Sequence, residues 1–358
     1  MVITHDYDRL NRETLRSYSS SADGVTGIAT TYDASNNVKT VVQHGPSVLT
    51  SSFNYDNFDR EELSKDGYGA SAAKTYDANG NKTALITQDG KSTTYAYDAL
   101  NRLQSMTSQS GTVSYGYDRS SLNTKVAHGN GVASVTVYDA ARRTLSVQHA
   151  RGSTSLSRSG YEYDINGNRT RETINRSGAA QVTTYGYDAS DRLVKTVVTE
   201  VDKAVTSEYG YDAVANRTSE TVTTVAGGAT TAVDKTFTYD GRNALTRIVD
   251  SQAGTIGMRY DLQGNLVEKT VGSDLTAYAY NARDDLMRVT RNGTVLGRYF
   301  SDHRGLRVEK EARDPMNPDA SPVRLRTLWD GRNAFQDRSV DGAVVARYEH
   351  DGRHPVGM

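Results

Sequence analysis

The sequence contains no cysteine, only one tryptophan, and only five prolines and five phenylalanines in 358 residues. Without cysteine the chain can form neither a disulfide framework nor a cysteine-type zinc site, and it has no thiolate nucleophile. Proline is too scarce to interrupt regular structure except locally. The fold must therefore be stabilised by ordinary packing and hydrogen bonding.

The chain also lacks an excess of charge of either sign. It has 42 basic and 43 acidic residues, so its formal net charge is −1. No basic stripe is present to neutralise phosphates, and we expect no nucleic-acid partner. No apolar run approaches the roughly 18 residues that a membrane-spanning helix needs, so we expect no membrane insertion. Residues 1–12 are polar and do not resemble a signal peptide.

Tyrosine is abundant, with 23 copies, and it recurs in a pattern. A tyrosine followed by aspartate occurs at intervals of 20 to 28 residues, with relaxed copies at Tyr280 and Tyr299. The tyrosines of these pairs are Tyr7, Tyr32, Tyr55, Tyr76, Tyr97, Tyr117, Tyr138, Tyr163, Tyr187, Tyr211, Tyr239 and Tyr260. Such regularity indicates a tandem repeat, in which each unit packs mainly on its neighbours.

The clearest repeat, residues 161–172, predicts a β-hairpin. Tyr161 and Tyr163 alternate and so point to one face of a strand. Asp164 begins the turn, because its carboxylate can accept a backbone N–H two residues on, and Gly167 supplies the positive φ that closes it. Asx-Gly pairs between repeats, such as Asn292-Gly293, predict the turns that join one hairpin to the next.

Fourteen such hairpins imply about 28 strands, given two strands of roughly six residues in each repeat. Strand twist accumulates in a sheet of that size, so we expect an all-β fold with a long, curved or spiralling antiparallel sheet that forms a partial or open shell. Tyrosine rings supply apolar area while their hydroxyls stay near water or a polar partner. Both faces of the sheet should therefore be only partly shielded from solvent.

The pattern Tyr-x-Tyr-Asp-x-x-Gly-Asn-Arg, as in residues 161–169, resembles the tyrosine-aspartate (YD) repeat of the Rhs family, and related copies cover nearly the whole chain. This family includes bacterial polymorphic toxins, the B and C components of Tc toxins, and teneurins. The resemblance implies a β-sheet that spirals into a hollow shell, which in toxin members encloses a C-terminal toxin domain.

By this resemblance the chain is a non-enzymatic shell segment of a bacterial polymorphic toxin. Its implied partners are a cargo toxin domain, carried in cis in the intact protein, and a secretion apparatus. The implied location is secreted or at the cell surface, by a specialised secretion system, with no signal peptide in this chain. The alternative is an extracellular YD-repeat module whose exposed tyrosines bind carbohydrate or protein.

We expect two segments. Residues 1–300 form the YD-repeat array, and residues 301–358 form degenerate late repeats that lead toward an Rhs core absent from this sequence. Within the second segment, residues 301–310 resemble a turn with its return strand, and residues 328–331 and 347–352 resemble further strand ends. Residues 314–323 hold three of the five prolines and predict an inserted loop.

No residue is expected to be catalytic, to bind a cofactor or to bind a metal. An aspartate repeated at every turn performs one backbone role, whereas a catalytic carboxylate needs its own environment. His350 and His354 have the spacing of two helical metal ligands, but the neighbouring Asp-Gly and His-Pro disfavour a helix. Gly227-Gly228 lacks the lysine of a phosphate-binding loop, and no Gly-x-Ser-x-Gly elbow occurs.

Overall fold

The computed structural model describes residues 2–19, 24–176, 178–313, 320–350 and 355–357. All regular elements in these ranges are β-strands, 33 in number, and β1 to β31 belong to one 31-stranded sheet. β32 (Glu349–His350) and β33 (Pro355–Gly357) form a separate pair. The prediction of an all-β array of antiparallel hairpins is confirmed.

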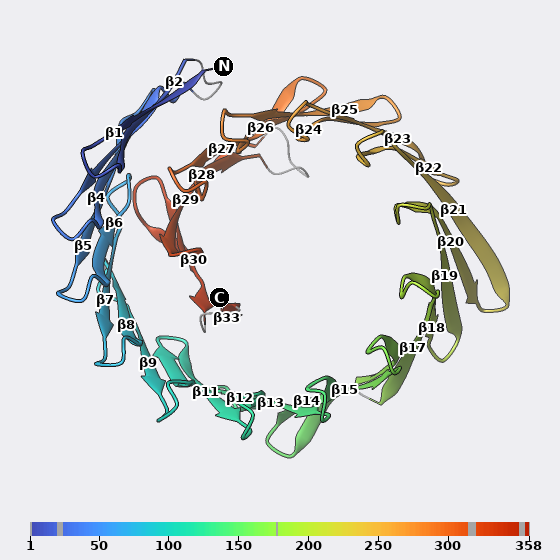
Figure 1. Cartoon of the computed structure of the whole chain (residues 1–358). Helices are drawn as coiled ribbons and strands as arrows, with labels where there is room; N and C mark the ends of the chain where they lie inside the picture. The colour runs from blue at the N-terminus through green and yellow to red at the C-terminus, as the bar shows by residue number, and fades with distance from the viewer. Residues whose placement is uncertain (1, 20–23, 177, 314–319, 351–354, 358) are drawn as a thin grey trace. The chain divides into compact units, whose positions relative to one another are not determined.

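The chain divides into two compact units. Unit 1 comprises residues 1–110, 261–267 and 275–358, and unit 2 comprises residues 111–260 and 268–274. Figure 1 shows the strands in chain order.

Unit 1 begins with β1 (Ile3–Tyr7), β2 (Glu13–Tyr18), β3 (Gly27–Tyr32), β4 (Val38–His44), β5 (Leu49–Tyr55), β6 (Glu61–Lys65), β7 (Ser71–Tyr76), β8 (Lys82–Thr87), β9 (Ser92–Tyr97) and β10 (Leu103–Ser108). Its later strands are β25 (Asp274–Tyr280), β26 (Leu286–Arg291), β27 (Thr294–Ser301), β28 (Arg307–Ala312), β29 (Val323–Asp330), β30 (Asn333–Ser339) and β31 (Val344–Arg347).

Unit 2 contains β11 (Gly111–Tyr117), β12 (Asn123–His128), β13 (Val132–Tyr138), β14 (Thr144–Arg151), β15 (Thr154–Tyr163), β16 (Arg169–Arg176), β17 (Ala179–Tyr187), β18 (Leu193–Thr199), β19 (Lys203–Tyr211), β20 (Arg217–Ala226), β21 (Ala229–Tyr239), β22 (Leu245–Asp250) and β23 (Gly254–Tyr260). β24 (Leu266–Val271) has residues in both units, and Asp274, the first residue of β25, belongs to unit 2.

Within each unit the strands pair antiparallel with their neighbours in the chain. The pairing slips by one residue at the tyrosine that ends the first strand of a hairpin: Glu162 lies opposite Arg171, but Tyr163 lies opposite Arg169. The same slip occurs at Tyr32, Tyr187 and the equivalent tyrosines. Each hairpin therefore carries a β-bulge beside its turn, and bulges increase the local twist.

The turn after each tyrosine has one geometry, well represented by residues 164–168. The carbonyl of Asp164 accepts the N–H of Gly167 at 3.2 Å, and the N–H of Asp164 donates to the carbonyl of Asn168 at 2.9 Å. The carboxylate of Asp164 accepts the N–H groups of Asn166 and Asn168 at 3.0 and 2.8 Å. Gly167 has φ of +92°, as the sequence predicted. This is a type I turn followed by one left-handed residue.

Replacing Gly167 by alanine should destabilise unit 2 by about 1 kcal/mol, because a Cβ is unfavourable at positive φ. No atom lies within 4 Å of the Cβ position, so the cost would be conformational and not steric. Gly241, in the second position of another turn, has equally open space without a positive φ. Gly241→Ala should instead stabilise by about 0.4–1 kcal/mol. Urea unfolding followed by circular dichroism would test both; two changes of the same sign would contradict the turn assignment.

In unit 1 the late strands fold back over the early ones. Ala70, Ala72 and Leu85 of the β7–β8 region pack against Leu328 of β29 and Phe335 of β30. Figure 1 shows β29 and β30 beside the face of β4 to β8. This two-layered region contains one of the hydrophobic cores of unit 1. A second hydrophobic cluster consists of Tyr18, Val25, Ile28 and Val41, and the turn residue Ala282 packs against it.

Unit 2 has no comparable second layer. Among its described residues, only Val113 and Tyr115 of β11 are buried; the others are partly or fully exposed. Unit 2 is thus a wall one sheet thick. The expectation that the faces of the sheet are only partly shielded from solvent is confirmed for this unit.

The proline-rich loop predicted for residues 314–323 has its first six positions outside the described residues. The turn and return strand predicted at residues 301–310 are confirmed as the turn before β28 and the start of β28, and the strand end predicted at residues 328–331 is confirmed as the end of β29. Of the strand end predicted at residues 347–352, β31 ends at Arg347, and positions 351 and 352 lie outside the described residues. Throughout the described ranges there is no helix with the length and apolar character that crossing a membrane requires.

Candidate functional site: the turn ladder and the covered strands

The tyrosine hydroxyls link each hairpin to the one before it. Tyr163 donates its hydroxyl to the carbonyl of Thr144, the first residue of the preceding return strand, at 2.8 Å. The same bond is made by Tyr32, Tyr55, Tyr76, Tyr97, Tyr138, Tyr187, Tyr211, Tyr239, Tyr260 and Tyr280. Trp329 takes the tyrosine's place in the last copy and donates its indole N–H to the carbonyl of Arg307 at 3.0 Å. In each copy the aromatic ring lies on the sheet, while its hydroxyl or indole N–H is hydrogen-bonded to a backbone carbonyl.

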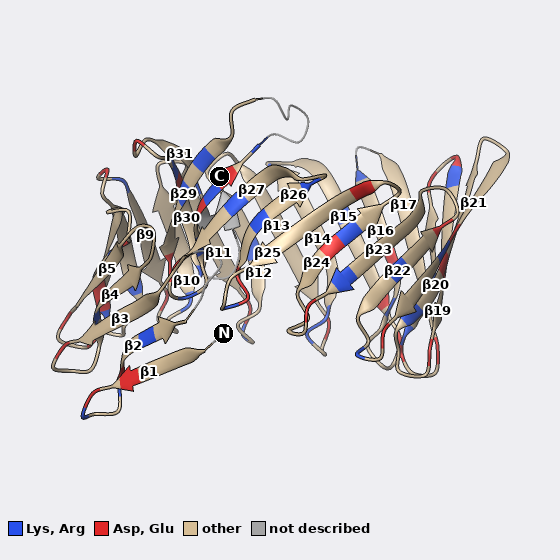
Figure 2. Cartoon of the chain, turned by 90° about the horizontal axis from the view of Figure 1, so that it is seen from above, with Lys and Arg blue, Asp and Glu red and all other residues tan. Residues whose placement is uncertain are grey.

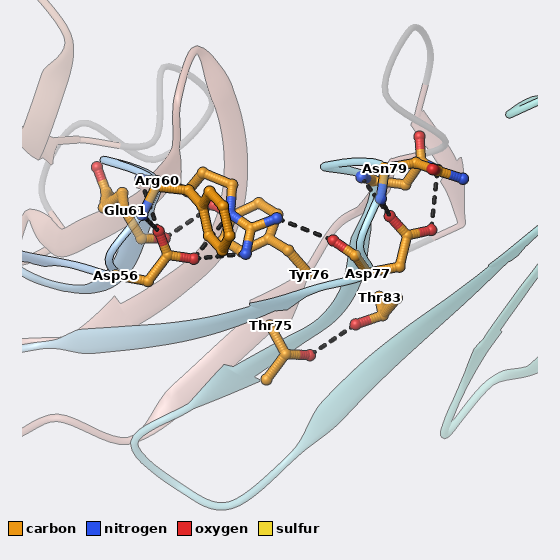
Figure 3. A network of polar contacts seen from close by, with 10 residues as sticks. Asp56, Arg60, Glu61, Thr75, Tyr76, Asp77, Asn79 and Thr83 are labelled. Carbon is orange, nitrogen blue, oxygen red and sulfur yellow. Dashed lines mark hydrogen bonds and ion pairs between the residues drawn. The ribbon is translucent and has the colours of Figure 1, made fainter.

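A second link runs from turn to turn, and in some repeats an arginine makes it. Arg60 donates Nε to its own turn carboxylate, Asp56, at 2.7 Å, and donates Nη1 to the carbonyl of Asp77 in the next turn at 2.9 Å. Its guanidinium also lies over the ring of Tyr76, 4.8 Å from the centroid (Figure 3). Arg143 and Arg192 repeat the whole arrangement in unit 2.

In other repeats an asparagine replaces the arginine and contacts a different group. Asn168 donates Nδ2 to its own turn aspartate and, at 2.7 Å, to the carboxylate of Asp191, the left-handed residue of the next turn. Four further asparagines make the same contact with the left-handed residue of the next turn. The pairs are Asn37 with Asp59, Asn81 with Asn101, Asn216 with Asn243, and Asn265 with Asp284. An asparagine in one turn is thus matched by a side-chain oxygen at the left-handed position of the next.

Tyr163→Phe should lower the free energy of unfolding by about 1 kcal/mol, since it removes the hydroxyl bond to Thr144 and leaves the ring in place. Tyr161→Phe is the matched control. Its ring lies beneath Arg169, 4.3 Å from the guanidinium carbon, but its hydroxyl has no hydrogen bond within the described chain. Urea unfolding should separate the two variants, and equal losses would show that the Tyr163 bond adds nothing.

The turn aspartates are stabilised in their charged form. The side-chain hydrogen bond from Arg12 holds the pKa of Asp8 below its usual range, and the backbone N–H of Arg192 does so for Asp188. The pKa is also lowered at Asp33, Asp56, Asp77, Asp98, Asp139, Asp164, Asp212, Asp240 and Asp261. Figure 2 shows charged residues of both signs at the turns. A paired, surface carboxylate of this kind is a structural group.

Because the folded-state pKa values of these aspartates lie below their unfolded value of about 3.9, their contribution to stability should be complete at neutral pH. It should be lost as the pH falls through the folded values. Far-UV circular dichroism during acid titration should therefore show little change above about pH 5 and a progressive loss below about pH 4. A transition centred above pH 5, or a fully folded chain at pH 2, would contradict this.

The two-layered region of unit 1 contains a buried ionic cluster. Glu309 of β28 is only 1% exposed and accepts bonds from Arg324 at 2.6 Å and from Arg326 at 2.8 Å. The Arg326 guanidinium lies 4.2 Å from the centre of the Tyr68 ring. Burial, with Glu309 nearby, raises the pKa of the Tyr68 hydroxyl. This cluster joins β28 and β29 to the turn before β7.

A second ionic contact joins Asp330 to the early strands. Asp330 pairs with Lys74 at 3.0 Å and with Lys82. Burial alone would raise the pKa of Asp330, but the two lysines outweigh it and the pKa is lowered. Arg347 reaches Asp89 in the same way. Late strands thus contact early strands through specific charged pairs as well as through the hydrophobic core.

The part of the chain that the structure describes brings no metal-ligand cluster together. No group of three or more histidine, cysteine, aspartate or glutamate side chains suited to a metal occurs among the described residues. His350 contacts the backbone carbonyl of Ala334 at 2.6 Å, and His354 lies outside the described residues. Gly227 and Gly228 both have positive φ and form the tight turn between β20 and β21. Sequence reasoning missed the Glu309 cluster, whose partners are separated along the chain and form no local motif.

Comparison with known proteins agrees with the geometry of the repeats. A family model described as Teneurin YD-shell matches residues 119–316, which is more than half of the chain. The chain belongs to this family. A model described as RHS Repeat matches residues 76–113 of the same YD-shell chain. The predicted family resemblance is therefore confirmed, and the family supports a shell-like structural role.

A solved structure shares the fold of this YD-shell chain at low sequence identity. A TcdB2-TccC3-TEV crystal structure is 13% identical, with a TM-score of 0.52, and the match covers 97% of this chain and 24% of that one. A Tc holotoxin pore of Photorhabdus luminescens, at 13% identity and a TM-score of 0.44, is matched over 97% and 23%. The chain thus spans about a quarter of these proteins. No curated protein matches it.

Proposed function

We propose that this chain is a non-enzymatic wall segment that encloses and shields a polypeptide cargo. The observation that carries the proposal is the single-layered wall of unit 2, in which all but two described residues remain at least partly accessible. A sheet that buries neither face has no core of its own. It serves as a surface, and its stability comes from strand pairing and from the links between turns.

The chemistry of the wall suits a loosely folded polypeptide. Half-exposed tyrosine rings offer apolar contact to a cargo. The charges at the turns are paired with charges of opposite sign, so the wall has no strong electrostatic potential that would hold a cargo tightly. Because these groups recur in every repeat, the wall would contact many parts of a cargo without selecting one sequence. By analogy with the toxin complexes named above, the cargo would be a toxin domain carried in cis. The protein would then act outside the bacterial cell after delivery by a secretion apparatus.

We further propose that the functional division lies near residue 300. Residues 1–300 would form the wall, and residues 301–358 would form a closing segment. Leu328 and Phe335 of this segment pack on the early strands, and Asp330 pairs with Lys74 and Lys82 there. A cargo following this segment would begin on the face of the early strands that the segment covers.

Protease protection tests this function. The chain is fused to a disordered reporter peptide with several trypsin sites, attached at the C-terminus in one protein and at the N-terminus in another. The C-terminal reporter should be cut about ten-fold more slowly, because cleavage follows the population of exposed sites. Adding Phe335→Asp should abolish the difference by displacing the closing segment from the core.

Equal cleavage of the two reporters would overturn enclosure. Binding of the unfused chain to glycans or to cell-surface protein, together with equal cleavage, would favour the alternative of an extracellular binding module. Circular dichroism of the Phe335→Asp protein provides the control that the repeats remain folded.

A further inference from the structure

The first strand of unit 1 has an open edge. β1 pairs antiparallel with β2, and no other described strand of the unit pairs with its far side (Figure 2). The N–H and the carbonyl of Val2 both face β2, where they bond to Ser19. Because these groups alternate in direction along an antiparallel strand, those of Ile3 and His5 point to the open side. β1 therefore presents unpaired backbone groups to a further strand.

Tyr7, at the end of β1, lacks the contact that the tyrosine ladder makes in other repeats. Tyr32 and the equivalent tyrosines each donate a hydroxyl to a carbonyl at the start of the preceding return strand, which for Tyr32 is that of Glu13. No described return strand lies on that side of β1. Tyr7 is 55% exposed, and its hydroxyl makes no hydrogen bond within the described residues. It thus offers a donor where such a carbonyl would lie.

Asn11, in the turn after Tyr7, offers an acceptor to a preceding turn. It is the left-handed residue of that turn, with φ of +60°. Its side chain is exposed and makes no hydrogen bond within the described residues.

Other turns show what such a residue contacts. Apart from Asn11, six of the described turns that follow the tyrosines have an aspartate or asparagine at the left-handed position. In all six, its side-chain oxygen accepts from the last residue of the preceding turn, an arginine at Asn36 and an asparagine elsewhere. Asn11 is therefore matched to a turn that ends in one of these two residues.

We propose that the open edge of β1 binds a YD hairpin of a second polypeptide chain, through the return strand that follows a turn ending in asparagine or arginine. An arbitrary strand would satisfy only the backbone of β1. A YD hairpin would also supply the carbonyl for Tyr7 and the side-chain donor for Asn11. This proposal does not depend on the enclosure of a cargo.

The return strands of unit 1 are not free to fill this edge. β2, β4, β6, β8, β26, β28 and β30 are each paired on both sides. β31 of a second copy is also unsuitable. It is the first strand of its hairpin, as β1 is, so the two would run parallel if their turns lay at the same rim, whereas β1 pairs antiparallel with return strands.

A peptide taken from the chain itself provides the probe. Residues 157–176 form a hairpin in which Ser157 lies opposite Arg176, so the two ends can be joined into a ring. In the chain, Asn168 of this hairpin donates to Asp191, and the carbonyl of Arg169 accepts from Tyr187. The free peptide would present the same groups to Asn11 and Tyr7. Fluorescence anisotropy of the labelled cyclic peptide, titrated with the full chain, should show saturable binding of one peptide per chain.

Three variants of the chain test the edge. Ile3→Pro removes an N–H that points to the open side and should abolish binding. Tyr7→Phe and Asn11→Gly should each weaken binding about three- to ten-fold, the loss expected for one hydrogen bond. Glycine accepts the positive φ at position 11, so that variant keeps the turn. Tyr161→Phe is the control and should bind as the unaltered chain does, because its hydroxyl makes no ladder contact.

A second peptide with Asn168→Ala decides whether the hairpin is recognised through its turn. The change should weaken binding to the unaltered chain about three- to ten-fold, and should have no effect on binding to the Asn11→Gly chain, because the two groups form one contact. An equal loss with both chains would overturn recognition by Asn11.

The proposal also fails if the peptide does not saturate the chain, or if Ile3→Pro binds it as the unaltered chain does. Sedimentation velocity separates the remaining occupant. Dimers of the full chain that Ile3→Pro abolishes, without any binding of the peptide, would assign the edge to a second copy of β1 and overturn the hairpin partner. Tyr7→Phe, which keeps the ring, decides the matter if Ile3→Pro proves unstable, and unchanged binding by it would contradict the ladder contact.

Discussion

Replacing Arg324 and Arg326 together by methionine should lower the free energy of unfolding of unit 1 by about 3–5 kcal/mol. The loss arises because Glu309, 1% exposed, would be left buried without either of the two arginines that pair with it. Neither methionine can donate a hydrogen bond to the buried carboxylate. Fluorescence of Trp329, the single tryptophan, would follow the unfolding during urea titration, since Trp329 lies on the same strand as both arginines.

Two comparisons make this result specific to the buried charge. Arg298→Met removes a pair with Glu311 whose arginine is 51% exposed, and should change stability by less than about 1 kcal/mol. Adding Glu309→Leu to the double variant should restore much of the loss, because the unpaired charge is then removed. If the double variant is as stable as Arg298→Met, the cluster does not stabilise the two-layered region of unit 1.

Leu85→Ala should cost about 2–5 kcal/mol, the range for removing a fully buried leucine side chain. Leu85 is 0% exposed and packs in the core that the early strands share with Leu328 and Phe335. The substitution would leave a cavity between the two layers. The measurement is again urea unfolding monitored by Trp329.

The neighbouring residue Ile86 supplies the control. It lies on the same strand with its side chain on the other face and is 37% exposed. Ile86→Ala should therefore cost much less than Leu85→Ala. Similar losses at both positions would mean that the late strands do not form a packed layer on β8.

The hairpin repeat could be predicted in detail because its determinants are local. Asp164 bonds to groups two to four residues away, and Gly167 takes up the positive φ that the turn requires. The last copy could be recognised as well, since Trp329-Asp330 keeps the order of aromatic ring and carboxylate. Absence of an enzyme site was also a sequence prediction, and it remains one.

The partners of the repeated side chains could not be assigned from the sequence. The repeat period indicates that Tyr163 lies on a sheet, but the acceptor of its hydroxyl, the carbonyl of Thr144, depends on strand register. The contact between Asn168 and Asp191 likewise spans 23 residues and depends on how successive turns are placed. A pocket beside Tyr18 is likewise formed between the first strands and the turns near residues 283 and 304, which the repeat period does not place together.

The sequence by itself determined the all-β repeat, its turns and the family of the chain, because hydrogen bonds within four or five residues fix a hairpin. The tertiary structure alone decided that β29 and β30 return to cover β7 and β8, with Asp330 beside Lys82, 248 residues away. Nothing in the period of the repeat encodes that return. It depends on burying Leu85, Leu328 and Phe335 together, a gain in free energy that exists only when both layers are folded.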